Sequence, residues 1–227
     1  INEIKIPTFV ILGNHDRGRD STGETLLKQI RVLGEKYCAW DLKVFNNQIN
    51  LLSARPCSSG GGYYLSKEVK GVYGPITEQD SINKIIKCSE ETVEEIPLII
   101  MSHAGPSGLG SEPKSICGKD WKLPSLDWGD RDLSAAISQI QKRRKVDVVI
   151  FGHMHNRLKR NLGLREMFKI DSKGTIYFNT AVVPRYKTDE DGKLLINFSW
   201  IEFEDKELRH VSHRWYSESG EICEEDK

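Results

Sequence analysis

The sequence VDVVI at Val146–Ile150, followed at once by FGHMH at Phe151–His155, decides the fold class of this chain. A short, almost continuous apolar run predicts a strand that is buried on both faces, as in the parallel sheet of an α/β protein. His153 and His155 stand one residue apart, where the chain turns off that strand. A single histidine at such a place is more often structural than a ligand, but two imidazoles that splay toward neighbouring points suit two adjacent metal ions.

Two further stretches follow the same plan. Phe9–Leu12 precedes Gly13–Asp16 (GNHD), and Leu98–Met101 precedes Ser102–Gly105 (SHAG). In each stretch a short apolar run delivers polar side chains to a loop that contains glycine. Ligand sites of α/β sheets lie beyond the carboxyl ends of such strands. Three strand ends that carry His, Asn and Asp are hard to explain by packing alone, so together they predict a metal site.

The blocks GNHD, SHA and GHMH resemble, in order and spacing, the last three of the five signature blocks of calcineurin-like metallophosphoesterases. This resemblance implies an α/β fold in which a sandwich of two mixed β-sheets is flanked by helices. It extends over nearly the whole chain, which we expect to be a single domain, residues 1–227. Three other segments resemble a cyanobacterial and plant subgroup: Gly105–Gly110, Ile116–Trp121 and Asn179–Arg185.

The first two signature blocks, Asp-x-His and Gly-Asp-x-x-Asp/Glu, are absent from the chain. In the family both precede the GNHD block, which here already occupies residues 13–16, and Ile1 is not an initiator methionine. We therefore expect a fragment or partial gene product whose domain is truncated at the N-terminus and lacks an opening βαβ segment. The site would then be half a site.

The resemblance implies a dinuclear centre with two divalent metal ions, manganese, iron or zinc. Asn14, His103 and His153 would ligate one ion, and His155 would help to ligate the other. A metal-bound water or hydroxide would be the nucleophile, since two ions about 3.5 to 4 Å apart lower the pKa of bound water to near 7. The bridging carboxylate and the remaining ligands would come from the two absent blocks.

The resemblance also gives His15 and Asp16 a catalytic role. His15 would be the acid or phosphate-contacting residue, and Asp16 would hold its ring and raise its pKa through a carboxylate hydrogen bond. The implied activity is metal-dependent hydrolysis of a phosphorylated substrate of unknown class, as a phosphatase or phosphodiesterase. Two cations without a bridging carboxylate repel each other, so residues 1–227 are expected to be inactive or weakly active. The alternatives are a non-catalytic interaction scaffold of the same fold and an inert fragment.

Length and composition favour one α/β domain with a well-buried core, since 38% of the 227 residues are hydrophobic. Lys+Arg and Asp+Glu are equal at 33 each, which gives no reason to expect nucleic acid or an anionic membrane as a partner. No run approaches the roughly 18 apolar residues of a membrane span. We expect a soluble, cytoplasmic protein, or a plastid protein if the source is a plant, with the oligomeric state left open.

Five cysteines without Cys-x-x-Cys spacing fit neither a disulfide framework nor a structural zinc site, which favours a reducing compartment. Cys117 stands closest to the expected active-site loop. It would be a nucleophile only with a paired base, and the sequence gives no evident base for it. A packing role is therefore the favoured interpretation.

Hydrophobic periodicity predicts the other elements. Strands are expected at residues 8–12, 50–55, 97–101, 175–179, 194–203 and 208–215, and helices at residues 26–33, 80–88, 90–95 and 132–144. The last two strands should form an antiparallel pair joined at residues 204–206. His210 and His213 fall on opposite faces of the last strand and are expected to be surface or packing residues.

Two loops are candidate parts of the site. Ser58–Gly62 (SSGGG) is expected to be a flexible surface turn, because the alternative, a phosphate cradle, lacks the Lys-Ser/Thr of a P-loop. The long segment Gly105–Gly129 leaves from the His103 strand end without periodicity and is expected to line or cover the pocket. Trp121 and Arg131 are candidate substrate contacts, although a tryptophan is more often part of a core. The basic residues in Asn156–Lys169 are expected to be solvated surface.

Overall fold

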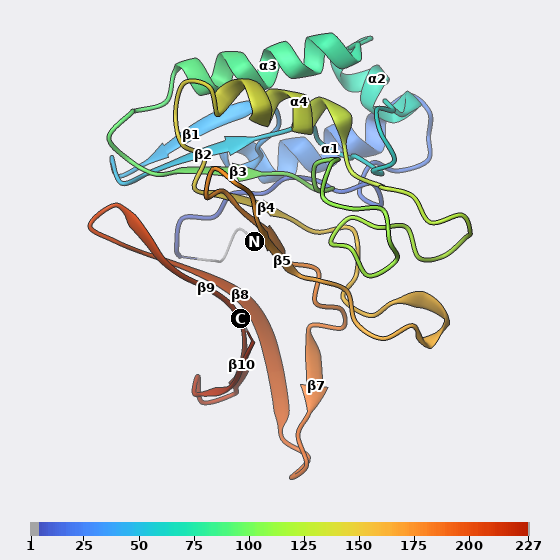
Figure 1. The fold of residues 1–227 in the computed structure, drawn as a ribbon. Helices are drawn as coiled ribbons and strands as arrows, with labels where there is room; N and C mark the ends of the chain where they lie inside the picture. The colour runs from blue at the N-terminus through green and yellow to red at the C-terminus, as the bar shows by residue number, and fades with distance from the viewer. Residues whose placement is uncertain (1–4, 227) are drawn as a thin grey trace.

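A computed structural model describes residues 5–226 of the chain. Two β-sheets lie face to face, and helices cover the outer face of the first sheet (Figure 1). The first sheet contains, in spatial order, β1 (Asp41–Phe45), β2 (Ile49–Ser53), β3 (Leu98–Met101), β4 (Val148–Phe151), β6 (Ile176–Asn179) and β5 (Phe168–Ile170). The second contains β10 (Ile222–Asp226), β9 (Glu207–Ser217), β8 (Leu194–Glu204) and β7 (Tyr186–Thr188).

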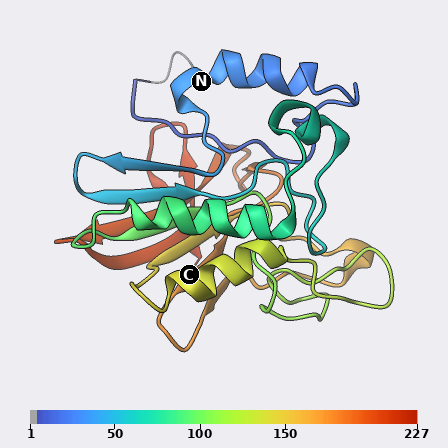
Figure 2. The same cartoon turned by 90° about the horizontal axis from the view of Figure 1, so that it is seen from above.

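Four α-helices accompany the sheets: α1 (Glu24–Leu33), α2 (Lys67–Tyr73), α3 (Glu78–Glu90) and α4 (Arg131–Ile140). Seen from above, α3 and α4 lie next to each other across the first sheet, with α1 farther to one side (Figure 2). Two short 3-10 turns, Gly34–Lys36 and Lys159–Asn161, complete the elements. None of the helices among residues 5–226 is long and apolar enough to cross a membrane.

The two sheets differ in strand direction. In the first, β2, β3, β4 and β6 are parallel, and β1 and β5 are antiparallel edge strands. Every pair in the second sheet is antiparallel. The α/β two-sheet fold is thus confirmed, but the second sheet is antiparallel rather than mixed, because its strands follow one another through short connections. Between β8 and β9 the turn residues Asp205 and Lys206 both have positive φ, the geometry that suits the twist of a tight hairpin.

The strand β4 explains why its sequence is continuously apolar. Val149 and Phe151 face the cluster that packs under α3 and α4, whereas Val148 and Ile150 face the second sheet. Both faces are therefore withdrawn from water, as the run Val146–Ile150 predicted. Each of these contacts fixes the point at which the GHMH block leaves the sheet.

Two predicted elements are wrong in part. Residues 8–12 form no regular strand: Val10 makes only an isolated bridge to Tyr37, because it pairs with the turn after α1 and not with a sheet. The helix expected at residues 90–95 is absent, since α3 ends at Glu90. The buried amide of Asn50 holds the following turn instead, donating to the carbonyl of Val93 at 2.8 Å and accepting from its N–H at 3.0 Å.

Cys117 is buried, and burial raises the pKa of its thiol. All five cysteines are free thiols. A thiol that stays protonated and packed is a poor nucleophile, which supports the packing role expected for Cys117.

His213 predicts a pH dependence of stability. Its ring is buried, its Nδ1 lies 3.0 Å from Ser199 Oγ, and burial lowers its pKa from 6.5 to about 4. The unfolded chain binds the proton first, so this contribution is present above pH 6.5 and is lost as the pH falls toward 4. We expect His213→Gln to reduce the acid loss of unfolding free energy by up to about 3 kcal/mol.

Urea unfolding of both proteins across this pH range measures the effect. His210→Gln, on the same strand and paired with Glu225 at 2.7 Å, is the control. An equal acid loss in His213→Gln and the parent protein would assign the loss to other groups.

Candidate active site

One cavity of about 570 Å³ brings the predicted site residues together. Its lining includes Asn14, His15, His103, His153 and His155. Its lining includes the residues that directly follow β3 and β4. The loops of residues 105–130 and 155–167 extend from that side of the first sheet (Figures 1 and 2). The structure therefore confirms the prediction that these five residues lie together in one pocket.

Backbone contacts hold the two central histidines in place. The N–H of Gly152 donates to the carbonyl of His103 at 2.9 Å, and the N–H of Ser102 donates to that of Ile150 at 3.0 Å. His153 has a φ of +66°, a left-handed backbone that costs energy in a residue other than glycine. This turn directs its ring to that of His103, with ring centroids 5.1 Å apart and planes at 67°.

Asn14 completes this group. Its Oδ1 lies 2.8 Å from Nε2 of His103, so the amide of the GNHD block and the imidazole of the SHA block meet directly. Asn14 is half-buried, and the turn that carries it is closed by the N–H of Asp16, which donates to the carbonyl of Gly13 at 3.1 Å. Three sequence blocks thus contribute one side chain each to a single cluster.

The histidines of the cluster are uncharged near neutral pH. Burial lowers the pKa of His103 to about 3 and that of His153 to about 4, and neighbouring imidazoles add to the effect. The pKa of His155 is also lowered, by burial and then by Lys159. Neutral imidazole nitrogens and an amide oxygen are suitable donors for a transition metal ion or zinc.

The neutral donors of this cluster fit a metal ion, but the cluster itself contains no carboxylate ligand. Within residues 5–226 no group of three His, Cys, Asp or Glu side chains is arranged to hold an ion. Asp120 is the carboxylate that lines the described cavity, and it accepts the N–H of Lys159 at 2.6 Å and faces Arg165 at 3.4 Å. The ligand roles of Asn14, His103, His153 and His155 remain predictions.

Asp16 has a different partner from the one expected. Its Oδ2 accepts the N–H of Gly13 at 2.7 Å, whereas no hydrogen bond to His15 is found among the described residues. His15 is exposed and lines the cavity without that support. In this structure Asp16 shapes the GNHD turn, because its short side chain reaches the backbone three residues earlier more readily than a neighbouring ring.

Gly13 is essential to this arrangement for steric reasons. A Cβ at this position would lie 2.5 Å from Cε1 of the His103 ring. We therefore expect Gly13→Ala to push His103 out of place and to lower metal-dependent turnover by about 100-fold, the effect typical of a 1 Å misplacement. Gly152→Ala is the control, since its Cβ would meet its nearest neighbours at an ordinary 3.9 Å.

Steady-state kinetics of the two variants tests the prediction, with circular dichroism to show that both fold. Equal activity of Gly13→Ala and Gly152→Ala would mean that the position of the His103 ring does not limit turnover.

The Ser58–Gly62 loop was expected to be flexible, but it is anchored. The N–H groups of Gly61 and Gly62 donate to the carbonyls of Trp128 and Gly129, at 2.6 and 2.9 Å. The Ser59 carbonyl accepts the Nε1–H of Trp128 at 2.9 Å. A backbone hydrogen bond to Ser59 also opposes the lowering of the pKa of His153. A backbone carbonyl of this kind fixes which ring nitrogen of a histidine remains available for a metal.

A buried ion network supports the same loop. Arg55 donates to Asp130 at 2.8 Å and to Asp132 at 2.9 Å, and Ser58 donates to Asp130 at 2.7 Å. Burial raises the pKa of Asp130 against the opposing effect of Arg55. Nothing in the sequence around these residues signalled the network, because its members are up to 77 positions apart.

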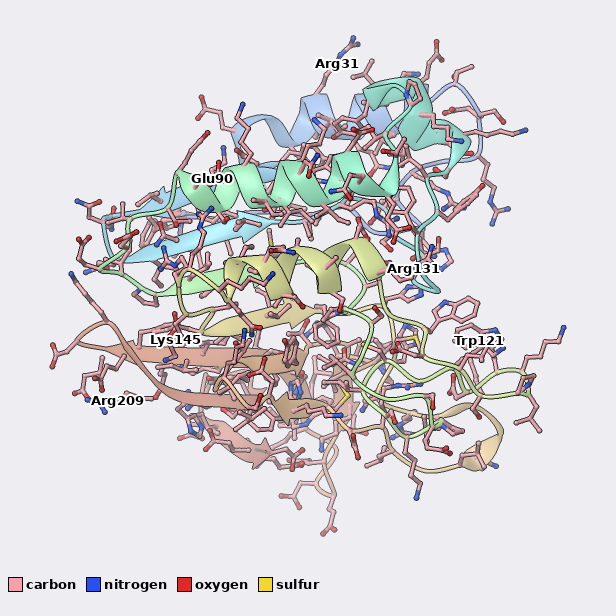
Figure 3. The ribbon with its side chains drawn as sticks, turned by 45° about the horizontal axis from the view of Figure 1, so that its top comes forward. Arg31, Glu90, Trp121, Arg131, Lys145 and Arg209 are labelled. Atoms are coloured by element: carbon pink, nitrogen blue, oxygen red, sulfur yellow. The ribbon has the colours of Figure 1, made fainter. Side chains whose placement is uncertain are left out.

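The segment Gly105–Gly129 contributes Asp120, Trp121 and Trp128 to the cavity, in line with its predicted role. Arg131 does not line the cavity. It stands at the start of α4 (Figure 3), with 63% of its side chain exposed, and it pairs with Glu78 at 3.0 Å. The proposed substrate contact at Arg131 is therefore wrong, whereas Trp121 lies beyond the strand ends (Figure 3) and remains a candidate.

Arg165 was expected to be solvated surface but is buried. It donates to four backbone carbonyls, at 2.6 to 3.0 Å: those of Pro113, Ser115, Gly118 and His155. One guanidinium thus joins the loop after GHMH to the wall that carries Asp120. In the sequence, only the position of Arg165 shortly after the GHMH block pointed to a role near the site.

The fold and the cavity define a class of protein: a two-sheet α/β structure in which an asparagine and histidines that follow two parallel strands line a basic pocket. The sequence model of the family described as calcineurin-like phosphoesterase matches residues 1–157, more than half of the chain. The chain belongs to that family, whose members typically use divalent metals to hydrolyse phosphoesters. The resemblance to a cyanobacterial and plant subgroup stays a prediction.

A search of curated proteins finds no match. Among solved structures, one crystal structure aligns with a TM-score of 0.46 at 11% sequence identity. The alignment covers 98% of this chain and 66% of the other, so this chain spans just under two thirds of that protein's length.

Proposed function

We propose that this protein is a metal-dependent phosphoester hydrolase. The observation that carries the proposal is the meeting of Asn14, His103 and His153, from three separate segments of the chain, in one cavity. Membership of the calcineurin-like phosphoesterase family supports it. A purely structural cluster would have no need to keep three neutral donors directed into a hollow.

In this proposal Asn14, His103 and His153 hold one divalent ion, and His155 contributes to a second. Bound ions would neutralise phosphoryl oxygens and lower the pKa of an attacking water. The imidazoles need no deprotonation to bind, because burial already keeps His103 and His153 neutral.

Side chains of the chain itself would bind the phosphate and complete the proton transfer. Arg157, Lys159 and Arg185 line the cavity, and Asp120 is already paired with Arg165. The lining is therefore electropositive and attracts an anion. His15, which is exposed at the same cavity, would donate a proton to the leaving group.

Two ions need more negative charge than these donors supply. Because the four proposed ligands are neutral and Asp120 is paired, we expect residues 1–227 to bind a single divalent ion weakly and a second one hardly at all. Isothermal titration with manganese or zinc measures the stoichiometry. Tight binding of two ions per chain would show that no further carboxylate is needed.

The activity is tested by stripping the metal and following hydrolysis of a generic aryl phosphate after manganese, iron or zinc is added. The assay is run on the natural polypeptide. We expect metal-dependent hydrolysis where a further carboxylate reaches the cavity, and little or none where the four neutral ligands act alone. No hydrolysis of any phosphoester by the natural polypeptide with any of the three metals would overturn the proposal and favour the interaction scaffold.

A further inference from the structure

The outer face of the second sheet has no helix on it within residues 5–226. All four α-helices accompany the first sheet instead (Figure 1). Side chains along a strand point alternately to the two faces of its sheet. Ile201 of β8 and Val211 of β9 point inward, where they pack against Val148 and Phe178 of the first sheet. The residues that alternate with them therefore form the outer face.

Four successive outer positions of β8 are apolar. They are Leu194, Ile196, Phe198 and Trp200, with exposed fractions of 37%, 38%, 53% and 42%. Tyr186 of β7 is the cross-strand partner of Ile196, so it shares this face, and it is 66% exposed. A solvated face of an antiparallel sheet normally carries polar side chains at such positions. This face is apolar where the alternation predicts polar residues.

The apolar surface continues across the other two strands. Tyr216 of β9 is the partner of Ile196, and Ile222 of β10 is the partner of Tyr216 and is 50% exposed. The ring of Tyr216 meets that of Phe198 edge to face, with centroids 5.8 Å apart and planes at 70°. These contacts join the residues into one surface, which we call the outer apolar patch: Tyr186, Leu194, Ile196, Phe198, Trp200, Tyr216 and Ile222.

The size of the outer apolar patch fits one side of a stable interface. Its three most exposed rings, Tyr186, Phe198 and Trp200, leave roughly 300 Å² accessible, since a whole aromatic side chain covers about 150 to 250 Å². The aliphatic members bring the patch to roughly 400 Å². One side of a standard interface buries about 800 Å², of which about 450 Å² is non-polar. Contiguous apolar patches of several hundred Å² usually mark interaction surfaces.

The order of the side chains along β8 makes the patch complementary to itself. Two aliphatic residues, Leu194 and Ile196, precede two aromatic residues, Phe198 and Trp200. A two-fold axis that crosses the strand near residue 197 places Leu194 opposite Trp200 of a second copy, and Ile196 opposite its Phe198. A smaller side chain then meets a larger one at each contact, which allows two facing sheets to interdigitate.

The charged end of the face is compatible with this arrangement. Beyond the patch, Arg214 pairs with Glu202 at 3.0 Å and with Glu225 at 2.9 Å, and His210 lies 2.7 Å from Glu225. The same axis places this end beside the Leu194 end of the second copy, so that the two charged clusters do not meet. They form a polar rim around an apolar centre, as in most interfaces.

We propose that the outer apolar patch is the interface between two copies of this chain, which associate face to face as a symmetric dimer. The proposal does not rest on phosphoester hydrolysis. None of the patch residues lines the cavity that contains the histidine cluster, so each copy keeps its own cavity.

Sedimentation velocity over a concentration series tests the proposal. We expect an equilibrium between monomer and dimer, without larger species. Phe198→Thr removes a ring close to the axis and keeps a residue that favours strands, and it should raise the dissociation constant by about 30-fold or more, the loss of a central hot spot. Tyr186→Thr should also weaken the dimer. Tyr64→Thr is its matched control, since Tyr64 is 60% exposed but lies outside the patch.

Tryptophan fluorescence locates the contact. Dilution should shift the emission to longer wavelength as Trp200 becomes exposed to water, and Trp200→Phe should lose most of this shift while it still forms the dimer. Circular dichroism shows whether each variant folds. Phosphoester hydrolysis per chain should be the same in Phe198→Thr as in the parent protein, so a failure of the proposed function leaves this test intact.

Three results would overturn the proposal. A dimer that both Phe198→Thr and Tyr186→Thr leave intact would place the interface elsewhere. Aggregates without a discrete dimer would show that the patch is adhesive but not self-complementary. A protein that stays monomeric at all concentrations would exclude the dimer. If Phe198→Thr then lowered the melting temperature more than Tyr64→Thr, another segment of the same polypeptide would be the occupant of the face.

Discussion

Replacing His103 or His153 by alanine is expected to lower metal-dependent phosphoester hydrolysis about a thousandfold or more. Each variant removes one of the three donors in the cluster, and a lost ion takes with it several kcal/mol of transition-state stabilisation, which corresponds to such a factor. The metal content of the purified variants should fall in parallel. His210→Ala, on β9 and paired with Glu225, should keep both activity and metal.

Kinetics and elemental analysis of the same samples decide the point. Circular dichroism and a thermal scan show whether each variant folds. Folded His103→Ala and His153→Ala proteins with parental activity and parental metal content would exclude the strand-end cluster as the metal site, whatever the activity of the parent protein.

Replacing Arg55 by methionine is expected to have the largest effect on stability. The side chain is 2% exposed and its guanidinium compensates both Asp130 and Asp132, of which Asp132 is fully buried. Removing one partner of such a network leaves buried charge without compensation and costs about 3 to 5 kcal/mol. Since whole domains are stable by only about 5 to 15 kcal/mol, the variant should be close to unfolding.

Urea denaturation of Arg55→Met and of Arg131→Met measures the difference. Arg131 also pairs with a carboxylate, Glu78, but the Arg131 side chain is 63% exposed and that of Glu78 34%, so its loss should cost less than about 1 kcal/mol. Equal midpoints for the two variants would show that Asp130 and Asp132 do not depend on Arg55 for compensation.

Local sequence patterns predicted those parts of the fold that depend on local rules. The apolar runs at β3 and β4 were recognisable because both faces of these strands are buried, and the tight connection between β8 and β9 was visible from its alternating flanks. The prediction of a strand at residues 8–12 was wrong, because an apolar pattern indicates burial but does not identify the segment with which the residues pair. Val10 pairs only with Tyr37.

The site likewise contains some residues that the sequence predicted and others that it could not predict. Asn14, His103 and His153 were predicted to lie together because each follows an apolar run in a recognisable block. Arg165 and the Arg55 network could not be, since their partners are backbone carbonyls and carboxylates that only the folded chain brings near. The resemblance implied that Asp16 holds the ring of His15, but its carboxylate accepts the N–H of Gly13 instead.

The hydrogen bonds of Arg165 to four backbone carbonyls restrict where a substrate can enter the pocket and where a product can leave it. Because one guanidinium joins the GHMH loop to the wall at residues 113–120, the two can separate only if its hydrogen bonds to Pro113, Ser115 and Gly118 break. We therefore expect the wall at residues 113–120 to stay fixed relative to the GHMH loop. We expect entry and exit to use parts of the lining that these bonds do not hold, such as Val183, which is accessible to solvent. A bulky group added at Val183 should slow product escape without disturbing the chemistry.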